Sequence, residues 1–428
     1  MGRTAVAALL AGGAIAAGAT GVAAREPRVI ATWTVPRAPL SAGVVVGGLS
    51  DLAASPIGGA LHVWTVTDRG PNGTVKIDGE KVRTLLAPDF APSLVRVRLP
   101  DGGGAAVVEQ VVPLRGADGR PLSGRPPGTD RLVDAKGRRP VADDPGGVDP
   151  EGLVAVGDGT FWIAEEYRPG LLHVDAAGRV LARFVPRGMA GVAGDRDSLP
   201  EIYARRRENR GFEALAASPG GSRLWALLQS PLDVPGRAAG RRTGNVRLLA
   251  FDPVAGAPVA EHVYRLGDPG DPAYLTHGSP PDDGKLCAMA ALDGDTLLVL
   301  EQDDHGLARL YAADLAAATD TLGLDPGDGR TLEQVADLPA AGVVPVRKTL
   351  VADMTALRQR MRAQVDEDTK EGGALKIEGL AVIDRQHVAV VNDNDFGVAQ
   401  GEDGPGRGTR VWLLELPVDL ETLVAAAP

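Results

Sequence analysis

The chain is organised in short apolar runs separated by turns, and five segments share one pattern of polar and apolar positions. Each segment begins with a polar residue and a short apolar strand, passes through a turn rich in Gly, Asp, Pro or Ser, and continues into a second strand that ends in an acid or an amide. The five segments are residues 48–70, 150–170, 212–232, 287–304 and 377–395. Two short strands joined by a turn predict a β-hairpin in each of them.

Further strand-like sequence follows several of these hairpins, at 93–114, 171–185 and 246–266. Each unit therefore has about four strands, and four-stranded units repeated around a ring make a β-propeller. We expect an all-β fold, a β-propeller of five or six four-stranded blades, in which strands 29–35 and 410–416 pair to close the ring. The alternative is a β-sandwich with coincidental hairpins, against which the polar residues at both ends of all five units argue.

Three longer gaps between the units are interpreted as loop or helix insertions, near 115–148, 268–284 and 315–376. The last gap contains residues 353–368, whose apolar positions favour an amphipathic helix that packs over one face of the protein.

The N-terminal segment has the features of a signal peptide. Arg3 supplies a positive charge, residues 5–19 are small and apolar, and residues 22–24 resemble a cleavage site. We expect residues 1–24 to be removed and the mature domain, 25–428, to be secreted, periplasmic or at the cell surface, with no membrane contact after removal. A retained N-terminal anchor is the alternative.

Composition and charge narrow the classes of function. The net charge is −11, and there is no basic patch with interleaved aromatic residues, so nucleic acid is not an expected partner. Cys287 is the only cysteine, which excludes an intramolecular disulfide and a zinc–thiolate site. The acidic balance is consistent with clustered carboxylates that bind a cation.

Aligning the five repeats gives two polar columns. The leading column, at the start of the first strand, holds Ser50, Glu151, Glu213, Cys287 and Glu378. The trailing column, four residues after an apolar anchor in the second strand, holds Asp68, Glu166, Gln229, Glu301 and Asn392. In a hairpin the start of the first strand lies beside the end of the second, so both columns are predicted at the same end of the ring.

Several carboxylates that converge in a restricted space must hold protons or enclose a cation. Calcium is the expected cofactor, since it takes six to eight oxygen ligands. The predicted metal ligands are Glu151, Glu213, Glu378, Asn392, Asp393, Asp68 and Glu301. A structural alternative is open for each glutamate, which could instead accept backbone N–H groups of a neighbouring blade.

Three residues are candidates for catalysis. Arg69 follows a trailing acid in a Gly/Pro turn and has a planar group suited to phosphate or carboxylate, although it could simply brace the turn through Asp68. His305 and Glu166 are candidates for moving protons. The chain has no G-x-S-x-G, H-E-x-x-H, phosphate-loop or dinucleotide motif, so a serine esterase lacks its usual signature.

The ordered motifs at 67–73, 149–166, 209–232 and 376–395 resemble the family described as "esterase-like activity of phytase". The resemblance covers roughly residues 43–416. It implies an exported protein that hydrolyses phosphate or carboxylic esters, with a small-molecule ester as its partner.

Three hypotheses follow from these observations. The first is calcium-assisted hydrolysis of a phosphate ester at the propeller mouth. The second is a calcium-dependent lactonase or carboxylesterase on the same scaffold. The third is a propeller that binds a ligand without turnover, since a fold does not dictate a function.

Overall fold

The computed structural model describes residues 26–55, 60–128, 131–267, 283–324, 330–365, 374–398 and 408–425. Most of the regular structure is β-strand, arranged in six sheets, and helices are few. The predicted signal peptide at 1–24 and most of the predicted insertion at 268–284 lie outside these residues, so they stay predictions.

Five of the six sheets begin with the two strands of one repeat, so the repeat in the sequence corresponds to a unit of structure. The first sheet contains β2 (Ala53–Ala54), β3 (Leu61–Val66), β6 (Ser93–Leu99) and β8 (Val107–Pro113). The second contains β11 (Pro150–Ala155), β12 (Phe161–Glu165), β13 (Gly170–Val174), β14 (Val180–Pro186) and β15 (Asp195–Leu199). The third contains β16 (Phe212–Ala217), β17 (Leu224–Leu228), β18 (Asn245–Asp252) and β19 (Ala257–Arg265).

The remaining two repeats begin the fourth and fifth sheets. The fourth contains β20 (Lys285–Ala291), β21 (Thr296–Gln302), β22 (Ala308–Asp314) and β23 (Arg347–Asp353). The fifth contains β24 (Lys376–Val382), β25 (His387–Asp393), β26 (Arg410–Glu415), β1 (Arg28–Thr34) and β7 (Gly104–Ala105). The predicted antiparallel pairing is confirmed in all five repeats, and two of the sheets have five strands instead of the expected four.

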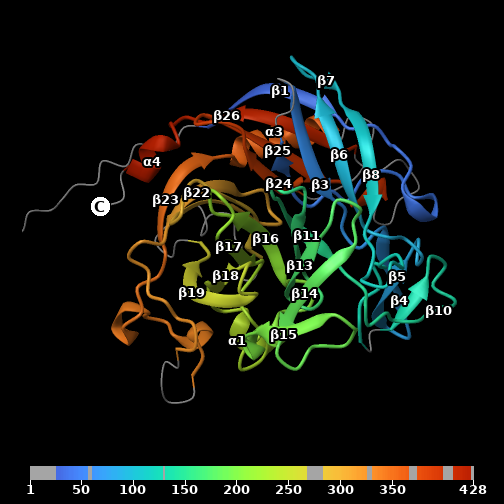
Figure 1. Ribbon diagram of the computed structural model, residues 1–428, viewed down its shortest axis with the longest axis horizontal. Coiled ribbons are helices and arrows are strands. Elements are labelled where there is room, and N and C mark those ends of the chain that lie inside the picture. Colours follow the sequence, from blue (N-terminus) through green and yellow to red (C-terminus); the bar gives the residue numbers. More distant parts are fainter. Residues whose placement is uncertain are drawn as a thin grey trace, which may run out of the picture.

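The first and the last strand of the described residues pair in the fifth sheet. β1 pairs antiparallel with β26, with Thr32 opposite Trp412, which confirms the pairing predicted for strands 29–35 and 410–416. The first strands of the sheets contact one another in the cycle β2, β11, β16, β20, β24 and again β2. Figure 1 shows the five sheets following one another around the molecule.

The sixth sheet is an insertion that no repeat begins. This inserted sheet has the order β10-β9-β5-β4 and consists of β4 (Asn72–Ile77), β5 (Glu80–Leu85), β9 (Leu132–Asp134) and β10 (Pro140–Val141). The β4–β5 hairpin lies between β3 and β6 in the sequence, although β3 and β6 pair with each other, and β5 pairs parallel with β9. Figure 1 shows it projecting beside the five sheets. The sequence analysis placed an insertion at 115–148 but missed this hairpin.

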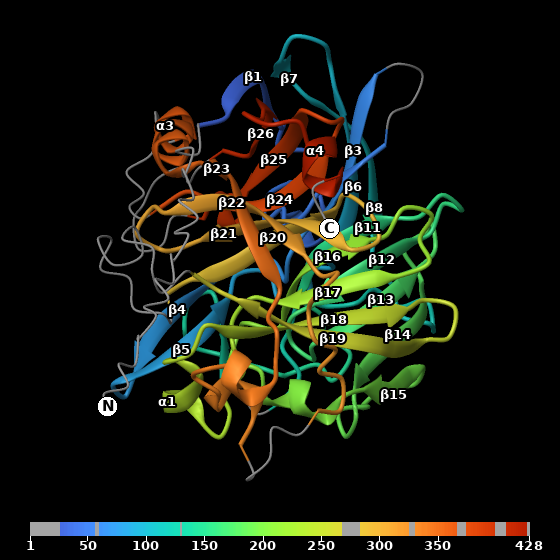
Figure 2. The same cartoon turned by 90° about the vertical axis from the view of Figure 1, so that its left-hand side faces the viewer.

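The few helices cover the sheets. The predicted helix at 353–368 is present as α3 (Thr355–Val365), with Leu357, Met361 and Val365 buried and a contact to β22. Figure 2 shows α3 beside the fourth and fifth sheets. The other α-helices of the described residues are short: α1 (Arg237–Gly240) and α4 (Glu421–Ala425). Five 3-10 helices are also present in this part of the chain: η1 (Ser41–Gly43), η2 (Glu201–Arg205), η3 (Leu332–Gln334), η4 (Pro339–Ala341) and η5 (Asp395–Gly397).

A buried aspartate ties the cycle of first strands together where it is weakest, at the two-residue strand β2. Asp51 Oδ2 accepts the N–H of Leu153 on β11 at 2.8 Å, and Oδ1 accepts the N–H of Leu380 on β24 at 3.3 Å and of Leu52 at 2.8 Å. Burial raises the pKa of Asp51 well above its usual range, and these three N–H groups oppose that rise. One side chain thus links the second and fifth sheets across β2.

We expect Asp51→Ala to lower the free energy of unfolding by about 3 kcal/mol or more, because it strands several buried N–H groups at about 1–3 kcal/mol each. Urea unfolding of the purified chain measures the change. The exposed turn residue Asp101 supplies the control, since Asp101→Ala removes no buried contact. Equal midpoints for the two variants would show that Asp51 does not hold the sheets together.

Candidate functional site

Four of the five leading residues occupy the same local structure, a β-bulge in the first strand of their sheet. In each case the ladder gains one extra residue at the leading position: Glu151, Glu213, Cys287 and Glu378. A bulge bends the strand and redirects a side chain. The sequence pattern therefore marks positions where the backbone turns side chains toward the end of the strands.

The glycines that follow two of these glutamates are required by close packing between sheets. A Cβ at Gly152 would lie 2.6 Å from the backbone N of Leu215, and one at Gly379 would lie 2.9 Å from the backbone C of Asp51. The Glu-Gly pairs at 151–152 and 378–379 thus combine a side chain directed into the site with a backbone that fits against the next sheet.

Three leading glutamates open into a pocket of about 480 Å³ that is lined only by polar and charged residues among those described. The acids are Asp68, Glu151, Glu166, Glu208, Glu213, Asp233, Glu378, Asp393 and Asp395; the bases are Arg69, Arg83, Arg207, Arg210, Arg241, Lys285 and Lys376; Asn72, Thr74, Asn209 and Gln229 complete the wall. Such a wall suits a charged, strongly hydrated ligand and not an apolar one.

The first strands lead from this polar pocket to a second one. The residues two positions after the leading column are Leu52, Leu153, Leu215, Met289 and Leu380, all buried, and they line a different pocket of about 730 Å³. The carboxylates of the polar pocket therefore have an apolar layer next to them, which removes water from one side of each.

Burial and mutual repulsion make these carboxylates hard to ionise together. Burial raises the pKa of Glu151 and of Glu213 well above the usual range, and nearby carboxylates raise both further. Burial, followed by Asp149, raises the pKa of Glu166 to about 8, although Arg69 opposes the rise. Burial, followed by Asp393, raises the pKa of Glu378 to about 8, against the effect of Lys376. The site favours bound protons or a bound cation.

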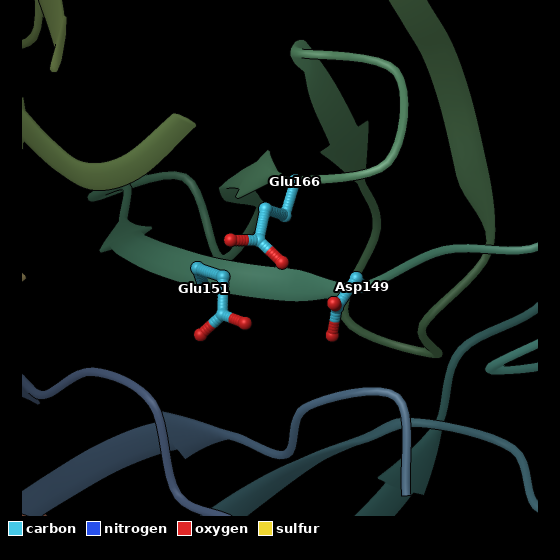
Figure 3. Close-up of side chains that lie close together, drawn as sticks. All are labelled: Asp149, Glu151 and Glu166. Carbon is cyan, nitrogen blue, oxygen red and sulfur yellow. The ribbon is translucent and has the colours of Figure 1, made fainter. Parts of the chain in front are cut away.

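The tightest acidic group combines the start of β11 with the end of β12. One carboxylate oxygen from each of Asp149, Glu151 and Glu166 lies within 4.8 Å of the others, and all three residues are buried. Figure 3 shows the three side chains clustered beside β11. We call these residues the acidic triad.

The acidic triad fits a hard divalent cation. Asp149 Oδ2 and Glu166 Oε2 are buried and receive no well-oriented hydrogen bond. One calcium ion at about 2.3–2.6 Å from each oxygen can span the observed spread of the three carboxylates. Asp149 was missed in the sequence analysis, although it stands two residues before Glu151 and directly precedes β11.

Arg69 both lines the pocket and braces the acidic triad. Its Nη1 lies 2.9 Å from Asp149 Oδ2, its Nη2 lies 3.8 Å from Glu166 Oε2, and its backbone N donates to Asp149 Oδ1 at 3.0 Å. The guanidinium also lies over the ring of Tyr167, 5.8 Å from its centroid. Arg69 can therefore brace neighbouring carboxylates and also face a ligand in the pocket, so the two interpretations from the sequence are compatible.

Most of the predicted site residues line the polar pocket, and three do not. Asp68, Arg69, Glu151, Glu166, Glu213, Glu378 and Asp393 line it, whereas Glu301, Asn392 and His305 do not. His305 is half exposed, and its Nε2 lies 3.2 Å from Asp283 Oδ2. The structure therefore separates His305 from the carboxylates that it was expected to serve.

Glu301 and Asn392 were assigned to the trailing column by an alignment that is wrong by one residue. Glu165, Glu301 and Asn392 each lie opposite the residue before their leading position, so the residues after them, Glu166, Gln302 and Asp393, are equivalent. A shift of one residue turns a side chain to the other face of a strand.

Both displaced residues have structural partners away from the pocket. Glu301 accepts hydrogen bonds from the hydroxyl of Tyr264 at 2.6 Å and from Lys348 Nζ at 2.5 Å. Asn392 Oδ1 accepts the N–H of Arg410 at 2.7 Å. The sequence reasoning thus found the right end of the second strand but not the right face.

The sequence analysis did not consider two lysines that occupy, in their own repeats, the position that Asp149 occupies in the second repeat. Lys285 and Lys376 stand two residues before Cys287 and Glu378, as Asp149 stands before Glu151. Lys376 Nζ pairs with Asp393 at 3.0 Å and with Asp395 at 2.6 Å. The two-residue period of a strand could have identified all three positions.

Cys287 takes a different role from the glutamates of its column. It is buried, its Sγ accepts a hydrogen bond from Gln302 Nε2 at 2.8 Å, and burial, together with Glu213 and Glu378, raises the pKa of the thiol. Such a thiol stays protonated and is a poor nucleophile.

Comparison with known proteins agrees with the motifs. The family model for esterase-like activity of phytase, named Phytase-like, matches residues 44–396. The chain belongs to this family. An uncharacterized secreted protein of Arthroderma benhamiae is 26% identical over 291 residues, which cover 58% of this chain and 56% of that relative. The chain thus spans about half the length of this curated relative.

Solved structures give only distant likenesses. A glycosyl hydrolase from Bacteroides ovatus is 13% identical, with a TM-score of 0.41 and coverage of 91% of this chain and 90% of that chain. The aldose sugar dehydrogenase from Streptomyces coelicolor, in its PQQ-bound form, is 13% identical, with a TM-score of 0.31 and coverage of 89% and 97%. Neither likeness is close enough to inform on the chemistry of the pocket. No helix in the described part of the chain has the length and hydrophobicity needed to cross a membrane.

The raised pKa values predict how stability depends on pH when cations are removed. Glu166 and Glu378 keep a proton in the folded chain up to about pH 8, whereas the ordinary value is 4.5. Their contribution to stability is therefore full below about pH 4.5 and is lost as the pH rises to about 8.

In excess chelator, we expect the thermal unfolding midpoint to be lower at about pH 8.5 than at about pH 5.5. Added calcium should raise the midpoint more at the higher pH, because a cation competes with protons for the carboxylates. The measurement is thermal unfolding at both pH values, with Glu378→Gln expected to reduce the fall seen in chelator. A calcium-induced shift of equal size at both pH values would contradict this account.

Proposed function

We propose that this chain is an exported five-bladed β-propeller that hydrolyses phosphate esters with the help of a cation, calcium in the first instance, held by the acidic triad. The triad supplies three buried carboxylates, and the pocket beside it supplies arginines and lysines. The propeller, the cation and the phosphate substrate are separate parts of this proposal, and each has its own support.

The cycle of contacts among the five first strands supports the propeller, because the blades of a propeller pack through their innermost strands around an axis. The pairing of β1 with β26 adds the N-terminal strand to the last sheet and so joins the two ends of the ring. The inserted sheet stands outside this repeat, which leaves five blades instead of six.

Export is supported by the N-terminal segment and by one relative. Residues 1–24 have a positive start, a short apolar run and a small-residue cleavage site. The relative from Arthroderma benhamiae is described as secreted. A calcium site suits this location, since extracellular modules work with calcium affinities of about 10⁻⁴–10⁻³ M.

The observation that carries the phosphate proposal is a buried acidic triad next to Arg69, at a pocket whose lining residues are polar or charged. A cation at the triad would offset negative charge on a phosphate and lower the pKa of a bound water. Arg69 lies on the triad and orients a phosphate oxygen through its planar group. The pocket walls exclude an apolar substrate and accept a hydrated, charged one.

A carboxyl group outside the triad supplies the proton that the leaving group needs. Glu378 lines the same pocket and holds a proton up to about pH 8. When water adds to phosphorus and the ester P–O bond breaks, Glu378 donates a proton to the departing oxygen. Of the two protons that the water brings, one stays on the phosphate product and the other returns Glu378 to its protonated form. His305, the other candidate from the sequence, lies outside the pocket and has no part in this proposal.

Removing one ligand of the triad should abolish hydrolysis. We expect Glu151→Gln to lower kcat/KM for 4-nitrophenyl phosphate by about 100-fold or more, since a metal ion contributes several kcal/mol to charge stabilisation. The chelator should do the same to the unchanged chain. Glu80→Gln, on exposed β5, is the matched control and should keep full activity.

A panel of substrates separates this proposal from the two other hypotheses. Calcium-dependent hydrolysis of 4-nitrophenyl acetate or of a lactone, with no hydrolysis of the phosphate, would favour the carboxylesterase or lactonase. Stabilisation by calcium without turnover of any substrate would favour a binding module. Activity that survives in both Glu151→Gln and the chelator would remove the metal from the proposal.

A further inference from the structure

Two arginines in the pocket donate hydrogen bonds to one amide oxygen. Asn209 Oδ1 accepts from Arg69 Nη1 and, at 3.1 Å, from Arg83 Nη2. Arg69 follows β3, Arg83 lies on β5 of the inserted sheet, and Asn209 precedes β16. Three distant parts of the chain therefore meet at a single acceptor, and the inserted sheet contributes one of the two positive charges.

The backbone around this acceptor is fixed by close contacts. A Cβ at Gly211 would lie 2.2 Å from the carbonyl oxygen of Glu166, and one at Gly124 would lie 1.6 Å from that of Arg69. Asn209 itself has φ 54°, a left-handed conformation that asparagine adopts more readily than most residues. The Asn-Arg-Gly sequence at 209–211 thus packs directly against the acidic triad.

The charges at this acceptor are not balanced. Arg69 has Asp149 and Glu166 beside it, whereas Arg83 has no carboxylate within ion-pair distance among the described residues. Arg83 donates to two amide oxygens, of Asn209 and, at 3.4 Å, of Asn72. Burial, followed by the charge of Arg69, lowers the pKa of Arg83, and Tyr167, Asp149 and Glu166 oppose this effect only in part.

Both lysines of the pocket differ from Arg83 in having carboxylate partners. Lys376 pairs with Asp393 and Asp395, and Lys285 Nζ pairs with Asp304 Oδ1 at 2.7 Å. Arg83 is partly buried, and the protein groups that it donates to are neutral amides, so its positive charge is available to a bound anion. The place for such an anion is beside Arg83 and Arg69.

We propose that Arg69, Arg83 and Asn209 form a phosphate-binding site, and that Arg83 is the residue that selects phosphate esters over neutral esters. Two planar guanidinium groups side by side offer paired N–H donors that match the oxygens of a phosphate dianion. The selection of substrate rests on the proposed hydrolysis, whereas the binding of the anion does not.

The direct test is binding of phenylphosphonate, a phosphate-monoester analogue that cannot be hydrolysed at the P–C bond. Calorimetric titration of the full chain, with and without calcium, should show binding that Arg83→Gln weakens by about tenfold or more, as expected for loss of a charge-assisted bidentate contact. Arg83→Lys should recover only part of the affinity, because lysine lacks the planar fork.

Arg131→Gln is the matched control for this titration. Arg131 is exposed, lies next to β9 of the same inserted sheet and pairs loosely with Asp78 at 3.9 Å. The Arg131→Gln variant should bind phenylphosphonate with the same affinity as the unchanged chain. Absence of binding to the unchanged chain, or equal affinities for it and for Arg83→Gln, would overturn the phosphate site.

A second variant distinguishes loss of binding from loss of folding. Asn209→Asp keeps the size of the side chain and tolerates the left-handed backbone, but it gives both arginines a charged partner inside the protein. We expect its thermal midpoint to rise while its affinity for phenylphosphonate falls by about tenfold. A purely structural role for the arginine pair predicts a change in stability with unchanged affinity, which would also overturn the proposal.

The outcomes separate this inference from the proposed function. Binding that depends on Arg83, without hydrolysis of any phosphate ester, keeps the anion site and removes the hydrolase. Hydrolysis of 4-nitrophenyl phosphate that is equal in Arg83→Gln and the unchanged chain keeps the hydrolase and removes the role of Arg83. If both hold, Arg83→Gln should lower kcat/KM for the phosphate ester and leave any hydrolysis of 4-nitrophenyl acetate unchanged.

Discussion

The polar pocket depends on one constraint, the burial of several carboxylates side by side at one end of the first strands. Glu151, Glu213 and Glu378 reach that place because each occupies a β-bulge, and the apolar residues two positions further along remove water from beside them. Like charges in such surroundings repel strongly, so the group must hold protons, pair with arginine or bind a cation. Arg69 compensates only part of this charge at the acidic triad. Protons or a cation must compensate the rest, and we propose a cation.

The chemistry of the pocket lies in the departures from the repeat. A strict repeat would place the same residue at each position around the axis, whereas the position two residues before the leading column is Asp149 in the second sheet and lysine in the fourth and fifth. The inserted sheet adds Arg83 from outside the repeat. The acidic triad is consequently suited to a cation, and Arg83 beside Arg69 is suited to an anion. A phosphate ester, which needs both, matches this asymmetry better than a neutral ester does.

The sequence predicted the units of this fold well because hairpins are local. Strand alternation and turn residues were sufficient for the five repeats and for the pairing of β1 with β26. The β4–β5 hairpin was missed because it is inserted in the sequence between β3 and β6, two strands that pair directly with each other. Glu301 and Asn392 were misplaced because an apolar anchor fixes a strand only to within one residue, and that residue decides the face. The meeting of Arg69, Arg83 and Asn209 depends on contacts between distant segments, which no local pattern contains.

The most direct test of the central claim is to locate a cation by anomalous scattering in crystals of the chain soaked in manganese, which takes oxygen ligands as calcium does. The account predicts an anomalous peak within about 2.6 Å of carboxylate oxygens from Asp149, Glu151 and Glu166, displaced by added calcium and absent from Glu151→Gln crystals. Well-diffracting soaked crystals with no peak at these three residues, or with peaks only elsewhere, would contradict it and leave the buried carboxylates as protonated structural groups.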